Sequence, residues 1–201
     1  MRLLAQALAL AYAAGISPFA TVAILGIAHR MEWLGDLPGA LDVVGSPWVI
    51  GAAGILYAIE FLATMVPGIA SVWETLQTFI RPPLAALLAG AAVWDAEGLA
   101  PIAVPLGAML GLTTHGTKLG MRYAIDASPE PITNGAANIA ELSVVAALVI
   151  AVWQHPYIAL GVALVVLVLL LLLVRAIWVG IARTVRSWRS GGRDFRGHPS
   201  T

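Results

Sequence analysis

The chain has no cysteine among its 201 residues, which excludes disulfides, thiolate ligands and cysteine nucleophiles. Charged residues are also scarce, at 11% against about a quarter in soluble domains. The formal net charge is zero, so there is no electrostatic signal for nucleic-acid binding. The four histidines form no HxxxH or HExxH pattern. We therefore expect no metal, no cofactor and no nucleic-acid partner, and we do not expect an enzyme.

Apolar sequence is abundant instead, since 60% of the residues are hydrophobic and the mean hydropathy is +0.88. Several apolar runs reach the roughly 20 residues that a helix needs to cross a bilayer. They predict an all-α, polytopic membrane bundle of about six transmembrane helices that contacts membrane lipids. The expected spans are Leu3–Ala28, Pro47–Val66, Val72–Trp94, Leu99–Ile125, Ile132–Trp153 and Tyr157–Ile181.

Arginine near the span ends sets the expected orientation. Arg175, Arg183 and further arginines flank the last span, while the loops on the opposite side are acidic. Six spans place both termini on the same side, so we expect both in the cytoplasm and the chain in the plasma membrane. Residues 1–188 are expected to form one transmembrane domain, and residues 189–201 a disordered basic C-terminal tail.

Two segments of the chain point to an internal repeat. Residues 46–63 and 128–144 each contain a Ser-Pro pair, then a glycine, then an acid six residues after that glycine. Serine before a proline at the first helical position favours a helix start. The pattern aligns Glu60 with Glu141 and predicts two three-helix repeats, inverted because three is odd. The repeats cover residues 1–94 and 99–181. A competing alignment pairs Glu74, Thr78 and Arg81 with Asn134, Asn138 and Glu141.

The third span contains Pro82 and Pro83, which remove two backbone donors from its middle. We expect a Pro-broken third helix. Two forms remain open: one kinked span, or an interfacial helix over Val72–Ile80 followed by a half-span. Arg81 sits at the expected break, where it could hold an anion such as a phosphate or carboxylate.

Polar side chains recur at helical spacing on spans two to five, so each set occupies one helix face. Facing inward, these faces would converge, whereas span six and most of span one lack such a stripe and look lipid-facing. The candidate transport or ion-binding residues are Glu60, Glu74, Arg81, His115, Lys118, Arg122, Asp126, Asn134, Asn138 and Glu141.

The charged candidates do not balance, because four are acids and three are bases. The acids are Glu60, Glu74, Asp126 and Glu141, and the bases are Arg81, Lys118 and Arg122. A carboxylate left unpaired at low dielectric tends to bind a proton or a cation. We predict that Glu60, Glu141 or both carry the coupling ion. The alternative is that these ion pairs only fix how the helices pack.

Two functions follow from these residues. The first is a small transporter or channel for a polar or ionic solute, coupled to protons or cations through intramembrane carboxylates. The second is a non-transporting scaffold or lipid-headgroup-binding protein with structural ion pairs. A polar cavity reaching Glu60 and Glu141 favours the first, and a dry, fully paired interior favours the second. A chain this small is expected to form a homo-oligomer, a dimer above all, to enclose a pathway.

Three stretches resemble a known family: AGISPF (14–19), AIEFLATMVPGIASVWETLQTFIRPP (58–83) and HGTKLGMRYAIDASPEPITN (115–134). Over residues 5–175 the chain is similar to the bacterial membrane family catalogued as domain of unknown function 4126. Ser17 stands where arginine is common in that family, and Ala63-Thr64-Met65 where Ala-Asp-Lys is common. The resemblance implies a protein of the bacterial inner membrane and the extent of its domain, but no activity.

Overall fold

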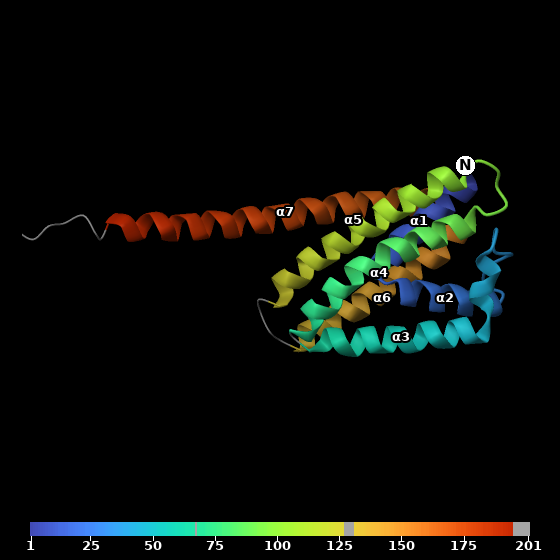
Figure 1. The fold of residues 1–201 in the computed structure, drawn as a ribbon, viewed down its shortest axis with the longest axis horizontal. Helices are drawn as coiled ribbons and strands as arrows, with labels where there is room; N and C mark the ends of the chain where they lie inside the picture. The colour runs from blue at the N-terminus through green and yellow to red at the C-terminus, as the bar shows by residue number, and fades with distance from the viewer. Residues whose placement is uncertain (67, 127–130, 195–201) are drawn as a thin grey trace, which may run out of the picture.

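The computed structural model describes residues 1–66, 68–126 and 131–194, and every regular element in them is helical. The predicted all-α class is therefore confirmed. The helices pack side by side in an elongated bundle, and the last helix continues well beyond it (Figure 1). The elements are α1 (Arg2–Ile16), α2 (Pro18–Arg30), the 3-10 helix η1 (Leu41–Gly45), α3 (Pro47–Met65), α4 (Ile69–Ala92), α5 (Ala100–Asp126), α6 (Pro131–Gln154) and α7 (Pro156–Asp194).

The prediction of one helix over Leu3–Ala28 is wrong, because α1 ends at Ile16 and α2 begins at Pro18. Ser17 between them has extended backbone, with φ −153° and ψ 105°. Proline lacks the N–H needed to continue a helix but is favoured at the first position of a new one. The Ser17 hydroxyl also accepts a hydrogen bond from the Ala20 N–H at 3.3 Å, which caps α2.

Helices α1 and α2 form a hairpin that enters the bundle from one end and returns to the same end (Figure 1). The 15 residues of α1 extend for about 22 Å, short of the roughly 30 Å hydrocarbon core. Helices α3 to α7 then run up and down in alternation, so the N-terminus and the end of α7 lie at opposite ends of the bundle (Figure 1). The expectation that both termini share one side depended on a continuous first span, and this arrangement does not support it.

Helix α1 is enclosed by protein, which overturns the expectation that most of span one faces lipid. Every residue from Ala9 to Ile16 is buried. A helix that is apolar all round suits the interior of a bundle as well as lipid, so the missing polar stripe could not distinguish the two. Helix α7 differs, since only 17% of its apolar window is buried.

In the described part of the chain, three helices are long and apolar enough to cross a membrane, which supports a membrane protein. These segments are Pro47–Met65 of α3, Asn134–Gln154 of α6 and Pro156–Gly180 of α7. Little of each is covered by protein, as expected for helices whose remaining surface faces lipid. Helices α4 and α5 have 24 and 27 residues, but buried charges interrupt their apolar sequence.

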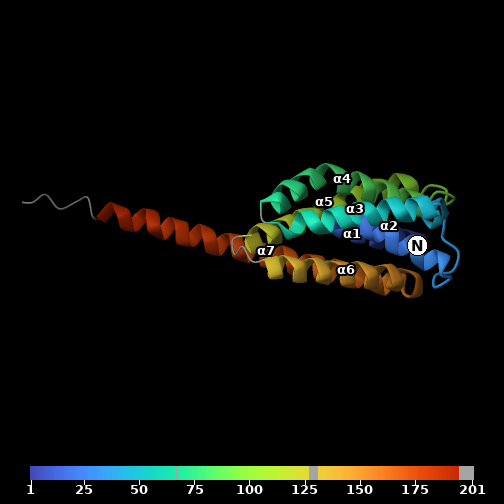
Figure 2. The same ribbon diagram turned by 90° about the horizontal axis from the view of Figure 1, so that it is seen from below.

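Helix α4 is continuous from Ile69 to Ala92 with Pro82 and Pro83 inside it, and it is arched in Figure 2. The expected break in the third helix is therefore absent, and of the two open forms the structure fits the single continuous helix. Helix α4 packs closely on α5 through small residues. A Cβ added to Gly111 of α5 would lie 2.5 Å from the Ala85 Cβ of α4, so only glycine permits this approach.

The six-span inverted repeat is not confirmed, because the hairpin and α5, which would correspond, differ in form. Helix α5 runs unbroken for 27 residues. Helices α3 and α6 do run in opposite directions, as an inversion requires (Figure 1). Helix α7 continues past Trp188 to Asp194, into the segment expected to be disordered. The rest of that segment, residues 195–201, lies outside the described chain.

Candidate functional site

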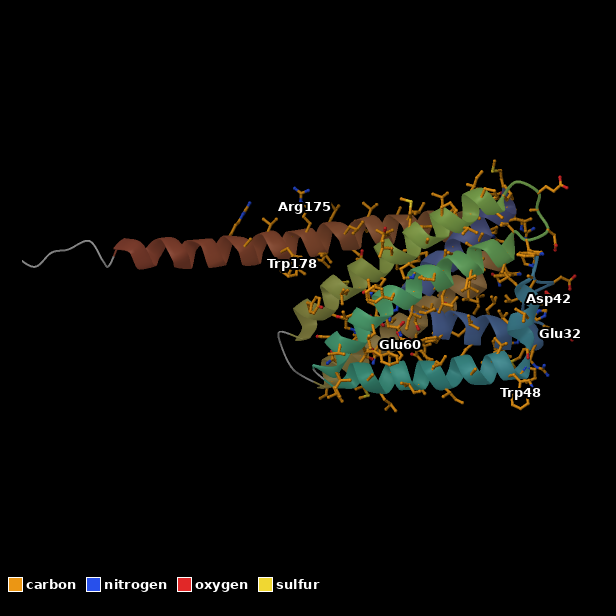
Figure 3. The ribbon with its side chains drawn as sticks, in the orientation of Figure 1. Glu32, Asp42, Trp48, Glu60, Arg175 and Trp178 are labelled. Atoms are coloured by element: carbon orange, nitrogen blue, oxygen red, sulfur yellow. The ribbon has the colours of Figure 1, made fainter. Side chains whose placement is uncertain are left out.

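Six charged side chains meet inside the bundle, and we call them the ion-pair cluster. They come from α3 to α6 and comprise three acids and three bases. Glu60 lies between the two ends of the bundle, away from the loop residues Glu32 and Asp42 at the end near the N-terminus (Figure 3). The members are Glu60 (α3), Glu74 and Arg81 (α4), Lys118 and Arg122 (α5) and Glu141 (α6).

Lys118 is the centre of the cluster, because its Nζ contacts one acid from each of three other helices. The distances are 2.7 Å to Oε2 of Glu141, 3.2 Å to Oε1 of Glu74 and 3.5 Å to Oε1 of Glu60. Only 8% of the Lys118 side chain is exposed. A single amine thus balances carboxylates that would repel one another at low dielectric.

Arg81 neutralises the two most deeply buried acids. Its guanidinium lies 2.5 Å from Oε1 of Glu60 and 3.0 Å from Oε2 of Glu74. Arg81 also lies 3.0 Å from Nδ1 of His115. Because arginine can only donate, Nδ1 accepts, and the ring proton on Nε2 faces the Thr78 hydroxyl at 2.9 Å. Arg81 is fully buried and already bound to two carboxylates, so it does not offer the open anion site expected of it.

Arg122 joins the cluster to the amides of α6. It donates to Oδ1 of Asn138, to Oδ1 of Asn134 at 3.4 Å and to Oε1 of Glu141 at 3.4 Å. Asn138 donates in turn to Oγ1 of Thr64 at 2.9 Å, which links α6 to α3. The i, i+4, i+7 spacing on α6 therefore places two amides and one acid on the face that meets α3 and α5.

The tip of the α1–α2 hairpin completes the site. The backbone carbonyl of Ile16, at the end of α1, accepts a hydrogen bond from Lys118 Nζ at 3.0 Å. The hydroxyl of Ser17 donates to Oε2 of Glu60 at 2.9 Å. A helix C-terminus carries partial negative charge and an N-terminus partial positive charge. The partly negative end of α1 thus faces the Lys118 cation, and the partly positive start of α2 faces the Glu60 carboxylate.

The cluster is balanced, which differs from the predicted excess of one carboxylate. All three acids have cationic partners within 4 Å. The fourth predicted acid, Asp126, ends α5, and its side chain lies outside the described residues. Exposure separates the three acids: the side chain is 4% exposed for Glu60, 0% for Glu74 and 25% for Glu141. Glu141 is therefore the most exposed of the three acids.

A family model described as a domain of unknown function (DUF4126) matches residues 4–176. The chain belongs to this family. The match contains the hairpin, the whole ion-pair cluster and the membrane-length part of α7 up to residue 176. Comparisons with curated proteins and with solved structures gave no match. Membership therefore defines the extent of the domain and assigns no activity to it.

The structure brings together nine of the ten candidate residues, and the side chain of the tenth, Asp126, lies outside the described residues. Sequence reasoning did not assign roles to Ile16, Ser17 or Gln77. Gln77 is 1% exposed, and its amide has no hydrogen-bond partner among the described residues. It lies between Glu74 and Arg81 on the same helical face, so the spacing could have found it. Ser17-Pro18 has the same Ser-Pro sequence as Ser46-Pro47, and each pair precedes a helix. The pair at 17–18 was not recognised as a helix start because it lies within a long apolar run.

Two cavities reach the ion-pair cluster, and both contact Lys118 and Glu141. The larger, about 320 Å³, lies among α1, α5, α6 and α7 and contacts Lys118, Arg122 and Glu141. The smaller, about 10 Å³, contacts Glu60, Lys118, Asn138 and Glu141. The larger cavity therefore touches Glu141 directly, while Glu60 is reached only through the smaller one.

Proposed function

We propose that the chain is a membrane transporter for a small ionic solute, and that the ion-pair cluster binds the solute and the coupling proton or cation. The observation that carries this proposal is the contact between the hairpin tip and the cluster. Non-helical backbone at membrane depth is tolerated only where protein or a water-filled cavity satisfies its polar groups. Many secondary transporters build their sites from discontinuous helices that end beside bound charges.

In this proposal α3 to α7 cross the bacterial plasma membrane, and the α1–α2 hairpin enters and leaves it from one side. Arg175 and Trp178 lie where α7 leaves the bundle, whereas Glu32, Asp42 and Trp48 lie at the other end (Figure 3). The positive-inside rule then places the end of α7 in the cytoplasm and the N-terminus outside. Trp48 and Trp178 fit the two membrane interfaces, where tryptophan is enriched.

Coupling is assigned to Glu141 and Glu60 because they share one cation. Lys118 contacts both acids, so a proton or cation that neutralises one of them frees the amine to interact more strongly with the other. The cavity of about 10 Å³ between them has room for about one water, which would link the two carboxylates. Loading of the exposed acid is thereby communicated to the buried one.

The test is a flux screen with the purified protein in liposomes that contain the pH dye pyranine. A panel of small inorganic ions and organic acids is added under a pH gradient, and a sodium gradient replaces it to test cation coupling. We expect solute-dependent flux with at least one compound. Glu141→Gln and Glu60→Gln should each reduce that flux by about tenfold or more, the equivalent of roughly 1.4 kcal/mol.

Glu97→Gln is the matched control, since Glu97 is an exposed acid in the loop after α4. It should leave the flux unchanged. Unaltered flux in both cluster variants would show that these acids do not couple transport. If the native chain gave no flux with any compound in the panel, the transporter proposal itself would be wrong.

The complete pairing of the cluster favours a second candidate, a non-transporting membrane scaffold. Each described acid in the cluster already has a cation, as a structural role requires. In a scaffold the Gln variants would lower thermal stability while no solute produced flux with the native chain. The transporter instead predicts flux that is lost in variants whose fold is retained.

A further inference from the structure

The larger cavity combines an apolar wall with a charged end. Helices α1, α5, α6 and α7 enclose about 320 Å³, within the range of small-molecule sites. Apolar side chains make up most of its wall, including Met121, Val166, Leu167 and Leu170. Lys118, Arg122 and Glu141 meet at its charged end. Such a cavity matches a molecule with an apolar body and one charged group.

Two buried polar atoms at this cavity have no partner within the described chain. Thr114 lines the cavity, is 4% exposed, and its hydroxyl makes no hydrogen bond. Arg122 also lines it, is 2% exposed, and its Nε has no acceptor. Buried polar groups are normally hydrogen-bonded. Both atoms are shielded from the cavity, so an acceptor group reaches them only when side chains at the charged end move aside, as the displacement of Glu141 would require.

The cavity opens on the apolar outer surface of the bundle. Ala140 and Val144 line it and are exposed on α6. On α7, Val165, Val168 and Leu169 are at least half exposed beside the lining residues. These surfaces face lipid when the bundle lies in a membrane, so a ligand with an acyl chain can enter from the bilayer.

The charge count indicates the sign of the ligand. Arg81 and Lys118 suffice for Glu60 and Glu74, since each of these acids contacts both bases. The third cation, Arg122, has Glu141 as its acid partner. Glu141 is the most exposed of the three acids. An external anion can therefore replace the Glu141 carboxylate without leaving a buried cation unpaired.

We propose that this cavity binds an anionic amphiphile, with the acyl chain along α7 and the acidic headgroup replacing Glu141 on Lys118 and Arg122. The headgroup is a carboxylate or a phosphate monoester, both of which arginine and lysine recognise. This inference names the substrate class of the site and rests on the proposed function. Glu141 acts as the internal competitor that keeps the cations paired when no ligand is bound.

The test is equilibrium binding of radiolabelled dodecanoic acid to the full chain in nanodiscs of a zwitterionic lipid. Dodecyl phosphate should compete with the label, while dodecanol, which lacks the charge, and acetate, which lacks the chain, should not. Glu141→Gln should tighten binding by about tenfold, because removing a competitor raises the fraction of binding-competent protein. Lys118→Met should weaken binding by about as much. Equal competition by dodecanol would overturn the proposal.

Ala140→Trp fills the cavity without altering a charged group and should abolish binding. Its matched control is Ile139→Trp, since Ile139 is the neighbouring exposed residue and does not line the cavity. Unchanged binding in Ala140→Trp would place the site elsewhere and overturn the proposal, even if Lys118→Met does not fold. Binding is measured without flux, so amphiphile binding by a chain that transports no compound at all contradicts only the proposed function. Flux of other ions with no amphiphile binding contradicts only this inference.

Discussion

Lys118 is the residue on which the balance of the cluster depends, because among the three bases of the cluster it is the one that contacts all three acids. Removing one partner of a buried ion pair costs more than the pair contributes, since an uncompensated charge remains at low dielectric. The same argument implies that removing a cation and an acid together costs less than removing the cation alone.

The first prediction concerns this balance. Lys118→Met keeps most of the side-chain volume and should lower the free energy of unfolding by about 3–5 kcal/mol. Adding Glu141→Gln should recover part of the loss, because the double variant again has equal numbers of buried acids and bases. Unfolding is followed by circular dichroism in detergent. A double variant no more stable than Lys118→Met would show that the cluster is not held by charge balance.

The sequence was sufficient to predict which residues form the site, but not which acid pairs with which base. Helical spacing identified Glu60, Glu141 and their neighbours because side chains three, four and seven apart share a face. Which faces meet depends on helix packing, which spacing does not contain. The predicted excess acid came from counting Asp126 at a span end together with the other three acids, and its side chain lies outside the described residues.

Among the elements, the hairpin tip is the feature that most changes the interpretation of the chain. It divides one apolar run into two helices and brings backbone groups to the cluster. Composition could not reveal it, because a crossing helix and two short helices buried in protein are both apolar. A break was predicted at Pro82-Pro83, but α4 continues through both prolines. The break occurs where Ser17 supplies a cap and Pro18 a helix start.

The second prediction tests the tip. Ser17→Ala removes both the cap bond to Ala20 and the bond to Glu60, and should lower the free energy of unfolding by about 1–3 kcal/mol. Ser46→Ala is the control, since Ser46 also precedes a proline at a helix start but makes no side-chain cap bond. Its effect should be much smaller. Equal melting temperatures for the two variants would contradict the role given to Ser17.

At the scale of the whole molecule, the hairpin makes the number of proposed crossings odd. Helices α3 to α7 leave the two ends of the chain at opposite ends of the bundle (Figure 1). The overall class could be predicted because long apolar runs are sufficient for it. The topology could not, because one undetected hairpin reverses the placement of the N-terminus. The homodimer remains a prediction.

The third prediction is this topology, and the absence of cysteine makes it simple to measure. Asp36→Cys lies in the exposed loop after α2, and Arg183→Cys lies on the far part of α7. A membrane-impermeant maleimide applied to intact cells should label position 36 and reach position 183 only after lysis. The native chain provides a blank, since it contains no thiol. Equal labelling of both positions in intact cells would restore an even number of crossings.

The contacts of Ser17 and Thr64 bear on how the family diverges. Ser17 donates to the carboxylate of Glu60, and Thr64 donates to its backbone carbonyl at 2.8 Å. By the resemblance, position 17 commonly holds arginine, position 64 aspartate and position 65 lysine. This chain has Ser17, Thr64 and Met65 there, so two positive charges and one negative charge are replaced by neutral side chains. Loss of the aspartate at position 64 is therefore expected to accompany loss of a basic residue at position 17 or 65, because an unpaired charge would otherwise remain beside Glu60.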